Sequence, residues 1–311
     1  MQQLDDAVTV LRAGSLCVVP TETVYGLAAD ARNDAAVRRI FATKGRPADH
    51  PLIVHLADAG DVDEWARGIP HYARLLAAAY WPGPLTLILR KQPDVLPIVT
   101  GGQDTVGLRV PAHPLTRELI RALGSGIAAP SANRFGRVSP TTVEHVVADL
   151  GALLTPTDAV VDGGPCTIGV ESTIVDCTGT QPRLLRTGAI TASMIEETTG
   201  LDVLGADGTV RASGTLASHY APNARVVIVE ADAPIPRLDN AGVIAMRDVA
   251  VPDGVQSLLA AADLGEYARG LYAALREGDV RQVTSIVAVL PPDEGLGSAI
   301  RDRLARAAHR A

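Results

Sequence analysis

Short apolar runs alternate with helix-like segments along the first two hundred residues of the chain. The runs are rich in Val, Ile and Leu, as buried strands are, and the segments between them repeat apolar residues three and four positions apart. This alternation predicts an α/β domain. The expected strands are 15–19, 52–56, 85–89, 106–110, 127–129, 159–161 and 173–175, and the expected helices are 33–43, 73–80, 115–123 and 143–150.

The periodicity disappears around residues 205–223, where Gly, Ala, Ser, Thr and Pro dominate. A segment of this composition cannot build a packed core, so we expect a movable linker. We predict a first domain of residues 1–200, a linker or lid of 201–223 and a smaller C-terminal α/β domain of 224–311. In that second domain the expected strands are 225–229, 242–246 and 283–290, and the expected helices are 264–276 and 296–308.

The composition limits the class of protein. Hydrophobic residues make up 47% of the chain but aromatic residues only 3%, so we expect a core of Val, Leu, Ile and Ala. The formal net charge of −7 has the wrong sign for a protein that holds nucleic acid by neutralising phosphates. We therefore expect no stable binding of RNA or DNA.

Targeting and cysteine signals favour a cytoplasmic protein. Residues 1–10 include two aspartates and no long apolar core, so we expect no signal peptide. Charged residues interrupt every hydrophobic stretch before the ~18 residues that a bilayer span needs, so we expect no membrane insertion. Cys17, Cys166 and Cys177 are widely spaced and match neither a disulfide framework nor a zinc site.

Cations that interrupt the apolar pattern are candidate binding residues. Lys44 and Arg46 follow a predicted helix, where a Gly and a Pro fix the backbone, and this context favours a site for phosphates. Arg109 lies within an apolar run and needs a partner there, either an internal Asp or Glu or the carboxylate of a ligand. Arg186 follows a pair of leucines.

Small polar residues follow several of the predicted strands. Segments 20–27 and 131–133 carry hydroxyl or amide side chains, and glycines within 163–173 free backbone amides to face an anion. Strand ends of an open α/β sheet meet at one edge, so these groups can converge. With the cations, they predict a site for a nucleotide and an amino acid. The chain has no Walker A or Gly-x-Ser-x-Gly motif, and residues 295–300 fail the dinucleotide-binding pattern.

A specific set of motifs occurs in a fixed order along the chain. They are segment 20–27, Lys44-Gly45-Arg46-Pro47 with Pro51-Leu52, Trp81-Pro82-Gly83-Pro84, Ser131-Ala132-Asn133 with Ser139-Pro140-Thr141, and segment 169–173. This set resembles the YrdC/TsaC family of threonylcarbamoyl-AMP synthases over residues 1–200. The tail, with Ser218-His219-Tyr220-Ala221-Pro222, is similar to the appended domain of the long-form members. The resemblance implies a twisted open mixed sheet with helices, YrdC-like, plus a smaller Rossmann-like α/β domain.

The resemblance implies an enzyme, a nucleotidyltransferase that combines L-threonine, bicarbonate and ATP into threonylcarbamoyl-adenylate and pyrophosphate. The product would serve the tRNA threonylcarbamoyl transferase machinery, which makes threonylcarbamoyladenosine beside the anticodon. Mg²⁺ would be carried by ATP, because no cluster of carboxylates in the sequence suggests a metal site made by the protein alone.

The resemblance also assigns roles to single residues. Lys44 and Arg46 would act electrostatically on the triphosphate, with no covalent nucleophile. Arg109 would bind the threonine carboxylate. The threonine pocket would comprise Thr23, His55, Arg109, Ser131 and Ser172, and the ATP site would be completed by His50, Thr105, Asn133, Ser139, Thr141, Arg186, His219 and Tyr220.

Two other functions stay open from the sequence. One is a non-catalytic RNA-binding module, against which the acidic balance and the scarce aromatic residues count. The basic stripe of Arg301, Arg303, Arg306 and Arg310 is expected to be a solvated helix face. The other is a carbamoyltransferase or hydrolase that uses the same pocket on another acceptor.

One segment departs from the family pattern. Long-form members commonly carry Pro-Gly-Met shortly before the His-Tyr-Ala-Pro run, whereas this chain reads Ala212-Ser213-Gly214-Thr215. The departure predicts a looser linker. It also leaves open whether His219 reaches ATP or packs at the domain boundary.

Overall fold

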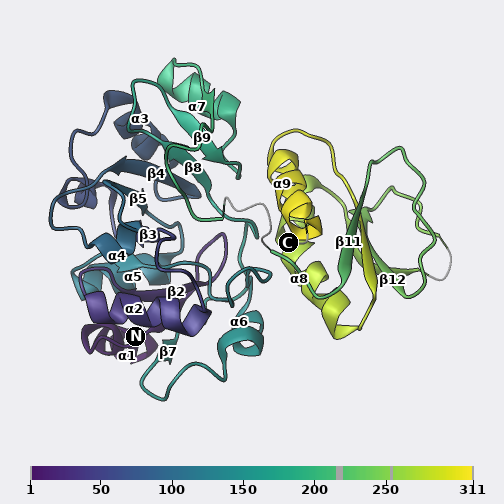
Figure 1. Cartoon of the computed structure of the whole chain (residues 1–311), viewed down its shortest axis with the longest axis horizontal. Coiled ribbons are helices and arrows are strands. Elements are labelled where there is room, and N and C mark those ends of the chain that lie inside the picture. Colours follow the sequence, from purple (N-terminus) through teal and green to yellow (C-terminus); the bar gives the residue numbers. More distant parts are fainter. Residues whose placement is uncertain (1, 215–219, 253–254, 310–311) are drawn as a thin grey trace.

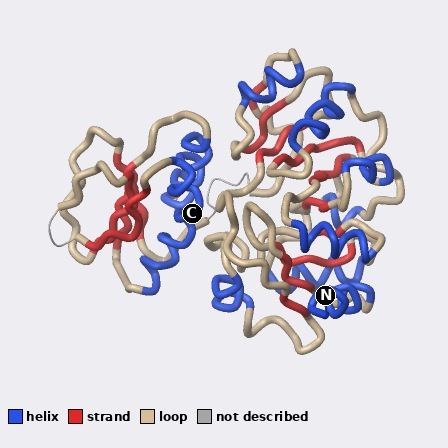
Figure 2. Tube along the Cα trace, turned by 180° about the vertical axis from the view of Figure 1, so that it is seen from behind, coloured by secondary structure: helices blue, strands red, loops and turns tan. Residues whose placement is uncertain are grey.

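The polypeptide forms two β-sheets, each with its own helices, and the two α/β units lie side by side (Figure 1, Figure 2). This computed structural model describes residues 2–214, 220–252 and 255–309. The predicted α/β class is confirmed: the first unit has a mixed sheet and the second a parallel one. The boundaries at residues 200 and 224 stay a prediction.

The first unit is built on a ten-stranded sheet. Its strands are β1 (Cys17–Val19), β2 (Gly26–Asp30), β3 (Ile53–His55), β4 (Leu85–Arg90), β5 (Thr105–Arg109), β6 (Ile127–Ala128), β7 (Ala159–Val160), β8 (Thr173–Asp176), β9 (Arg183–Arg186) and β10 (Leu204–Gly205). Their order is β10-β9-β8-β4-β5-β3-β6-β2-β1-β7. Parallel and antiparallel pairs alternate near the middle, since β8 and β4 are parallel, β4 and β5 antiparallel, and β5 and β3 parallel.

Helices cover this sheet on both faces. They are α1 (Gln2–Arg12), α2 (Asp34–Lys44), the 3₁₀ helix η1 (Ala59–Glu64), α3 (His71–Tyr80), α4 (Pro97–Thr100), α5 (Pro114–Leu123), α6 (Val143–Leu150) and α7 (Ala192–Thr199). The Asn33 side chain caps α2 by accepting a hydrogen bond from the Ala36 amide. The helix ends at Gly45, whose left-handed backbone (φ 63°) turns the chain sharply between Lys44 and Arg46.

The alternation of side chains along the strands separates the two faces of the large sheet. Val54 and Leu108 belong to the main core cluster, together with residues of α2 and α3. His55 and Arg109 are paired across β3 and β5, so they lie side by side on the opposite face. Helices α1 and α5 cover the end of that face near β1. Over β3, β5, β4 and β8 this face leaves room for a pocket.

Several elements are not indicated by the sequence pattern: α1, β2, β9, α7, β10 and β13. Strand β2 shows why. Its sequence, Gly-Leu-Ala-Ala-Asp, lacks the β-branched residues that favour strands. It is nevertheless extended because it pairs with β1 on one side and β6 on the other. Tertiary pairing here overrides a weak local preference.

The expectation that the Gly- and Ser-rich linker cannot pack is wrong for residues 210–214. Val210 and Ala212 pack against Ile88 and Ile174 on the open face of the large sheet. The backbone of Arg211 exchanges two hydrogen bonds with the Gln103 side chain, at 2.8 and 3.1 Å. Two small apolar side chains and these backbone bonds are enough to hold the segment on the sheet.

The second unit has a four-stranded sheet of parallel neighbours, with both of its helices on the side toward the first unit (Figure 1). Its elements are β11 (Arg225–Val229), β12 (Ala241–Met246), β13 (Gln256–Ala261), α8 (Leu264–Val280), β14 (Ser285–Val289) and α9 (Leu296–Ala308), and the strand order is β11-β14-β12-β13. The expected solvated stripe on α9 is wrong for Arg303, which is fully buried. Arg301 and Arg306 are partly exposed, and Arg310 lies outside the described residues.

The cysteines are free and buried at all three positions. Burial raises the pKa of Cys17 and of Cys166 to about 12, so both thiols stay protonated at neutral pH. Of the helices in the described ranges, none is both long and apolar enough to cross a bilayer.

Candidate active site

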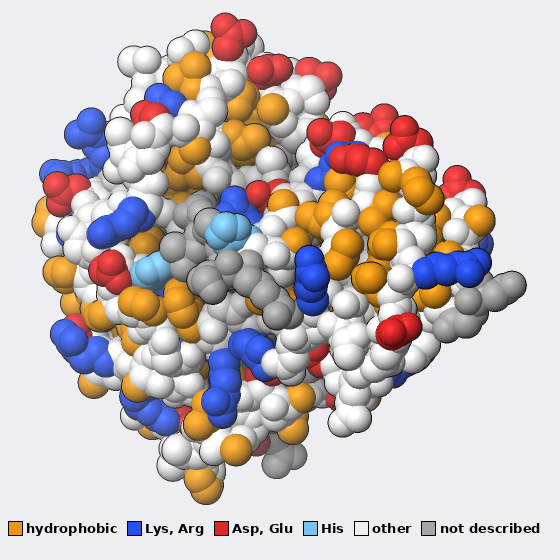
Figure 3. All heavy atoms as spheres, turned by 45° about the vertical axis from the view of Figure 1, so that its right-hand side comes forward, with side chains coloured by type: hydrophobic (Ala, Val, Ile, Leu, Met, Phe, Trp, Pro, Cys, Tyr) orange, Lys and Arg blue, Asp and Glu red, His pale blue; other side chains and the backbone are white. Residues whose placement is uncertain are grey.

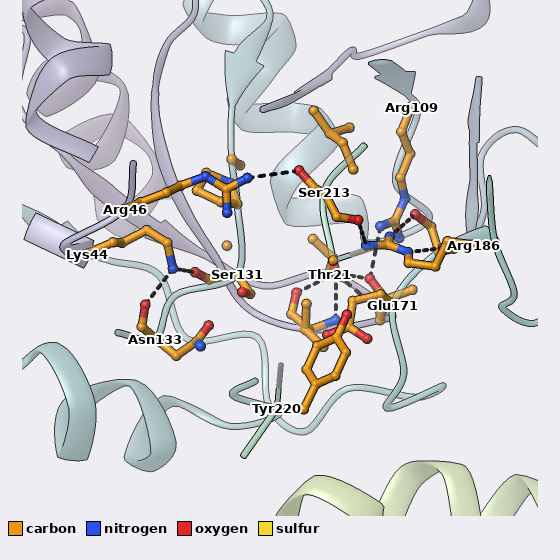
Figure 4. Close-up of a pocket in the computed structure, with 18 of the residues that line it drawn as sticks. Thr21, Lys44, Arg46, Arg109, Ser131, Asn133, Glu171, Arg186, Ser213 and Tyr220 are labelled. Atoms are coloured by element: carbon orange, nitrogen blue, oxygen red, sulfur yellow. Dashed lines mark hydrogen bonds between the residues drawn. The ribbon is translucent and has the colours of Figure 1, made fainter. Parts of the chain in front are cut away.

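A pocket opens on the face of the large sheet that carries His55 and Arg109, and Figure 4 shows Arg109 among its lining residues. Loops from distant parts of the sequence complete its wall, including the turn after β1, the segment after β6 and residues 213–214. Ten of the predicted site residues line it: Thr23, Lys44, Arg46, His55, Arg109, Ser131, Asn133, Ser172, Arg186 and Tyr220.

Lys44 is buried at the end of α2 and turns toward the loop after β6. Its Nζ donates two hydrogen bonds, each 2.5 Å long, to the carbonyl oxygens of Ser131 and Asn133. Burial, reinforced by the nearby Arg46 charge, lowers the pKa of Lys44 well below its ordinary value. An anion bound beside Nζ would offset that cost, because an opposite charge favours the protonated amine.

Arg46 lies across the same pocket wall with little exposure to solvent. Its Nη2 donates to the Pro51 carbonyl at 2.9 Å and to the Ser213 hydroxyl at 3.2 Å, and its guanidinium lies over the Phe135 ring. Its buried Nε atom has no hydrogen-bond partner among the described residues. Burial lowers the pKa of Arg46 to about 10, so the residue remains a cation at neutral pH.

Arg186 reaches the pocket from the end of β9. Nε and Nη2 donate to the backbone oxygen and the hydroxyl of Ser172, both at 3.0 Å, and Nη1 donates to the Ser213 carbonyl at 2.8 Å. Burial lowers the pKa of Arg186 below its ordinary value. Ser213 therefore contacts two pocket cations, Arg46 and Arg186, at once (Figure 4).

Arg109 has an internal acidic partner, which the sequence left as one of two alternatives. Its Nη2 lies 2.7 Å from Glu22 Oε1, and both side chains are buried. Nη1 donates to the Thr23 hydroxyl at 2.9 Å, and Nε donates to the Gly83 carbonyl at 3.2 Å. These three contacts fix the plane of the guanidinium, which lines the pocket.

His55 lies beside Arg109 on the neighbouring strand. Burial, together with the charge of Arg109, lowers the pKa of His55 to about 3. Its imidazole is therefore neutral at physiological pH and can accept a hydrogen bond at one ring nitrogen. Nδ1 of this ring is buried without a hydrogen-bond partner within the described part of the chain.

Four predicted ATP-site residues lie outside the lining of this pocket. Ser139 donates to Glu171 Oε1 at 2.6 Å, and Thr141 contacts His145. His50 packs edge-on against Phe135, with ring centroids 5.3 Å apart. Thr105 begins β5 and lines a smaller cavity beside the 210–214 segment. His219 lies outside the described residues.

Sequence reasoning assigned no role to Glu22, Glu171, Phe135 or Ser213, all of which contact the pocket cations or line the pocket. Glu22 and Glu171 are both buried carboxylates within segments rich in small polar residues. The sequence carries one signal: each acid stands inside a segment, 20–27 or 169–173, that is rich in hydroxyl side chains or glycine amides. Only the fold shows which cation each acid meets.

Glu171 is a buried acid held by several donors. Burial alone would raise its pKa, but the charges of Arg303 and Arg186 and hydrogen bonds from Ser139 and Tyr272 outweigh burial and lower it to about 2. The carboxylate is therefore ionised at every pH at which the protein would normally work.

The low pKa of Glu171 predicts an acid-dependent loss of stability. In the unfolded chain this group returns to its usual 4.5, so the unfolded state takes up the proton first as the pH falls. Its contribution, roughly 3 kcal/mol, is fully present above pH ~4.5 and is lost as the pH falls through about 2. Denaturant unfolding of the wild type and of Glu171→Gln should therefore differ most above pH ~4.5. If the unfolding free energies of the two proteins differed by the same amount at every pH down to ~2, the low pKa of Glu171 would be contradicted.

Two protein-family models match the chain in succession. The model described as "Telomere recombination" matches residues 9–188, and the one described as "Threonylcarbamoyl-AMP synthase, C-terminal domain" matches residues 190–309. Together they cover almost the whole chain.

Curated and solved proteins are similar over nearly the full length. The threonylcarbamoyl-AMP synthase of Bacillus subtilis is 43% identical, with 98% of this chain and 93% of the relative covered. The enzyme of that name from Pyrococcus abyssi is 41% identical, with 96% and 91% covered. The crystal structure of P. abyssi Sua5 complexed with L-threonine superposes with a TM-score of 0.89 at 38% identity, covering 98% of this chain and 94% of that one.

Proposed function

The chain belongs to the Sua5/YrdC family of threonylcarbamoyl-AMP synthases, and from this premise we propose how its pocket makes threonylcarbamoyl-adenylate. The protein is an enzyme of the nucleotidyltransferase type that uses ATP and L-threonine. The observation that carries the assignment to this pocket is that four buried cations, Lys44, Arg46, Arg109 and Arg186, line it together.

The reaction has two bond-forming steps. The threonine amine attacks the carbon of bicarbonate, and loss of water leaves a carbamate on the nitrogen. A carbamate oxygen then attacks the α-phosphorus of ATP, the bond from that phosphorus to the bridging oxygen breaks, and pyrophosphate leaves. Negative charge gathers on phosphate oxygens throughout, so fixed cations and alignment of the two reactants supply most of the catalysis.

Lys44, Arg46 and Arg186 form the phosphate end of the pocket in this proposal. Lys44 and Arg46 act electrostatically on the triphosphate, since each is already desolvated and needs no reorganisation when the ligand arrives. Arg186 and Tyr220 lie toward the second unit and would contact the nucleotide there. Asn133 supports this arrangement because its Oδ1 is buried without a hydrogen-bond partner in the described chain and can accept from a ligand.

The threonine end is proposed around Arg109, with Thr23, His55, Ser131 and Ser172. The Arg109 guanidinium, oriented by Glu22, would bind the threonine carboxylate. His55 is neutral, so it can accept a hydrogen bond from the threonine ammonium or hydroxyl without repelling the former. Carbamate formation requires the neutral amine, so the threonine ammonium must first give its proton to bicarbonate or water.

Magnesium is proposed to enter as part of the MgATP substrate. The described residues hold no group of three or more His, Cys, Asp or Glu that could bind a metal ion by themselves. The phosphate oxygens of ATP and water would therefore supply the ligands that this cation prefers. We also propose that the adenylate passes to a tRNA threonylcarbamoyl transferase, and that the reaction takes place in the cytoplasm, where free thiols such as these persist.

The RNA-binding alternative finds less support on the visible surface. On the face drawn in Figure 3, Lys and Arg side chains form separate patches, interrupted by acidic and apolar side chains of the described residues. A protein that follows a nucleic-acid backbone usually presents a continuous basic track.

The proposed reaction is tested by measuring pyrophosphate release while each substrate is omitted in turn. We expect release to need ATP, threonine and bicarbonate together. Release that is undiminished without threonine and bicarbonate would indicate simple ATP hydrolysis, and no release with all three would contradict the proposal.

A further inference from the structure

The C-terminal unit reaches the wall of the pocket through two buried side chains. Arg303 of α9 is 0% exposed, and its Nε donates to Glu171 Oε2 at 2.8 Å. Tyr272 of α8 is also fully buried and donates from its hydroxyl to the same oxygen at 2.7 Å. Glu171 itself lines the pocket. Tyr272 and Arg303 are each more than one hundred positions from Glu171 in the sequence, and both bind its carboxylate.

The loop that carries Glu171 is docked closely on the second unit. A Cβ placed on Gly169 would lie 2.5 Å from the Cα of Arg269 in α8, so only glycine fits at this contact. The backbone there has φ 83°, which glycine also favours. Nearby, Arg276 of α8 donates to the Val138 carbonyl and pairs with Asp149 at 2.8 Å. The position of Glu171 is therefore fixed from the C-terminal side.

The charge of Glu171 matters because of where it lies. It follows Val170 directly and precedes Ser172, the residue that accepts two hydrogen bonds from Arg186. A carboxylate at this place would repel a triphosphate unless another cation neutralised it. Arg303 provides that positive charge at 2.8 Å and also donates to the Thr187 carbonyl, which holds its guanidinium in place.

The same two residues also define the position of Tyr220. The ring of Tyr220 stacks on Tyr272, with centroids 5.5 Å apart and planes inclined by 27°. The Arg303 guanidinium also lies over the Tyr220 ring, 5.4 Å from its centroid. Tyr220 is buried and lines the pocket close to Gly214 and Arg186. An aromatic side chain at the nucleotide end of the pocket is thus held by the C-terminal unit.

We propose that Arg303 and Tyr272 are positioning residues of the nucleotide site, which act by neutralising and orienting Glu171 and by fixing Tyr220. This inference rests on the proposed function, in which that end of the pocket binds ATP. The C-terminal unit then has a defined part in the reaction. It completes the ATP site by holding Glu171 of the first unit and Tyr220 of the linker. A purely structural role, in which the network only joins the two units, is the alternative to be tested.

The test compares ATP affinity and the threonine affinity of four proteins by calorimetry. Arg303→Met removes the cation that is paired with Glu171 and leaves the carboxylate with less positive charge around it, so we expect ATP binding to weaken about 10- to 100-fold while threonine binding changes little. The double variant Arg303→Met with Glu171→Gln removes both charges, and the amide can still bond to Ser139 and Tyr272. We expect it to recover ATP affinity to within about threefold of the wild type. Arg301→Met is the control, because Arg301 is on the same helix but pairs with Glu230 inside the second unit.

The outcomes separate the two roles. Recovery in the double variant supports positioning through charge. Equal losses in the single and double variants, or an unchanged ATP affinity in Arg303→Met, overturn the proposal. If Arg303→Met does not fold, Tyr272→Phe takes its place: it keeps the ring stacked on Tyr220 and removes only the hydroxyl bond to Glu171. A loss of about 3- to 10-fold in ATP affinity, with threonine binding intact, then supports positioning, and no loss overturns it. ATP binding and pyrophosphate release by the wild type test the proposed function separately.

Discussion

Replacing Lys44 with Met should lower the rate of threonylcarbamoyl-adenylate synthesis by about 10²- to 10³-fold, the cost typical of losing one preorganised charge-stabilising donor. The Lys44 side chain is buried at the pocket, where the carbonyl oxygens of Ser131 and Asn133 hold its Nζ in place. A bound triphosphate favours the protonated amine, so the positive charge is present at the phosphates as negative charge develops. Single-turnover measurements of pyrophosphate release at saturating ATP would report the effect on the chemical step.

Lys91→Met is a matched control for this experiment. Lys91 is only partly buried, lies outside the pocket lining and donates to the Val95 carbonyl at 3.1 Å. It should lose little activity. A Lys44→Met protein that folds and reacts at the wild-type rate would contradict the role of Lys44. A fold that collapses while ATP affinity stays normal in the surviving protein would show that this lysine is structural.

Replacing Arg109 with Met should have two separate effects. Threonine binding should weaken by about 2 to 5 kcal/mol, because a buried charged hydrogen bond to the ligand is lost. The protein should also lose about 3 to 5 kcal/mol of unfolding free energy, because Glu22 would be left as a buried charge without its partner. Calorimetric titration with threonine and with ATP, together with denaturant unfolding, measures both quantities.

The double variant Arg109→Met with Glu22→Gln separates these effects. Removing the second charge should recover most of the lost stability, because no buried carboxylate is left unpaired. Threonine binding should not recover, since the guanidinium is still missing. Equal losses of ATP and threonine affinity, or recovery of threonine binding in the double variant, would refute the carboxylate role of Arg109.

The cations of the site could be predicted from the sequence because each one breaks an apolar pattern. Lys44 ends an amphipathic helix and Arg109 interrupts a strand, so burial without a partner is implausible for either. Their acidic partners could not be predicted in this way. Glu22 and Glu171 stand in loops, where no periodicity says which side chains face inward. Pairing them with a cation requires the sheet order.

The burial of Arg303 could have been predicted from the spacing of the apolar residues around it in the last helix. The stripe of arginines on the last helix predicts a solvated face, yet Ile300, Leu304 and Ala307 lie three, one and four positions from Arg303, on the buried stripe of α9. Helical spacing alone therefore places position 303 on the apolar face. A charged residue on such a face needs a buried partner, and that partner, Glu171, belongs to the other unit.

In the linker, a segment that the composition predicts to be movable is packed on the sheet. Its composition suggested a segment without a packed position, but a short stretch needs little apolar area when a sheet face is open beneath it. Ala212 fills such a place, and Ser213 contacts both Arg46 and Arg186. Composition predicts how much core a segment can build, and it does not predict whether a neighbouring surface will receive it.

The measurement that tests the central claim most directly follows the carbon of bicarbonate. The enzyme is incubated with ATP, threonine and ¹³C-labelled bicarbonate, and the products are separated at once and analysed by mass spectrometry. The account predicts threonylcarbamoyl-adenylate that carries the label in its carbamoyl group, formed together with an equal amount of pyrophosphate. Pyrophosphate that appears with AMP alone, or an adenylate without the label, would contradict it.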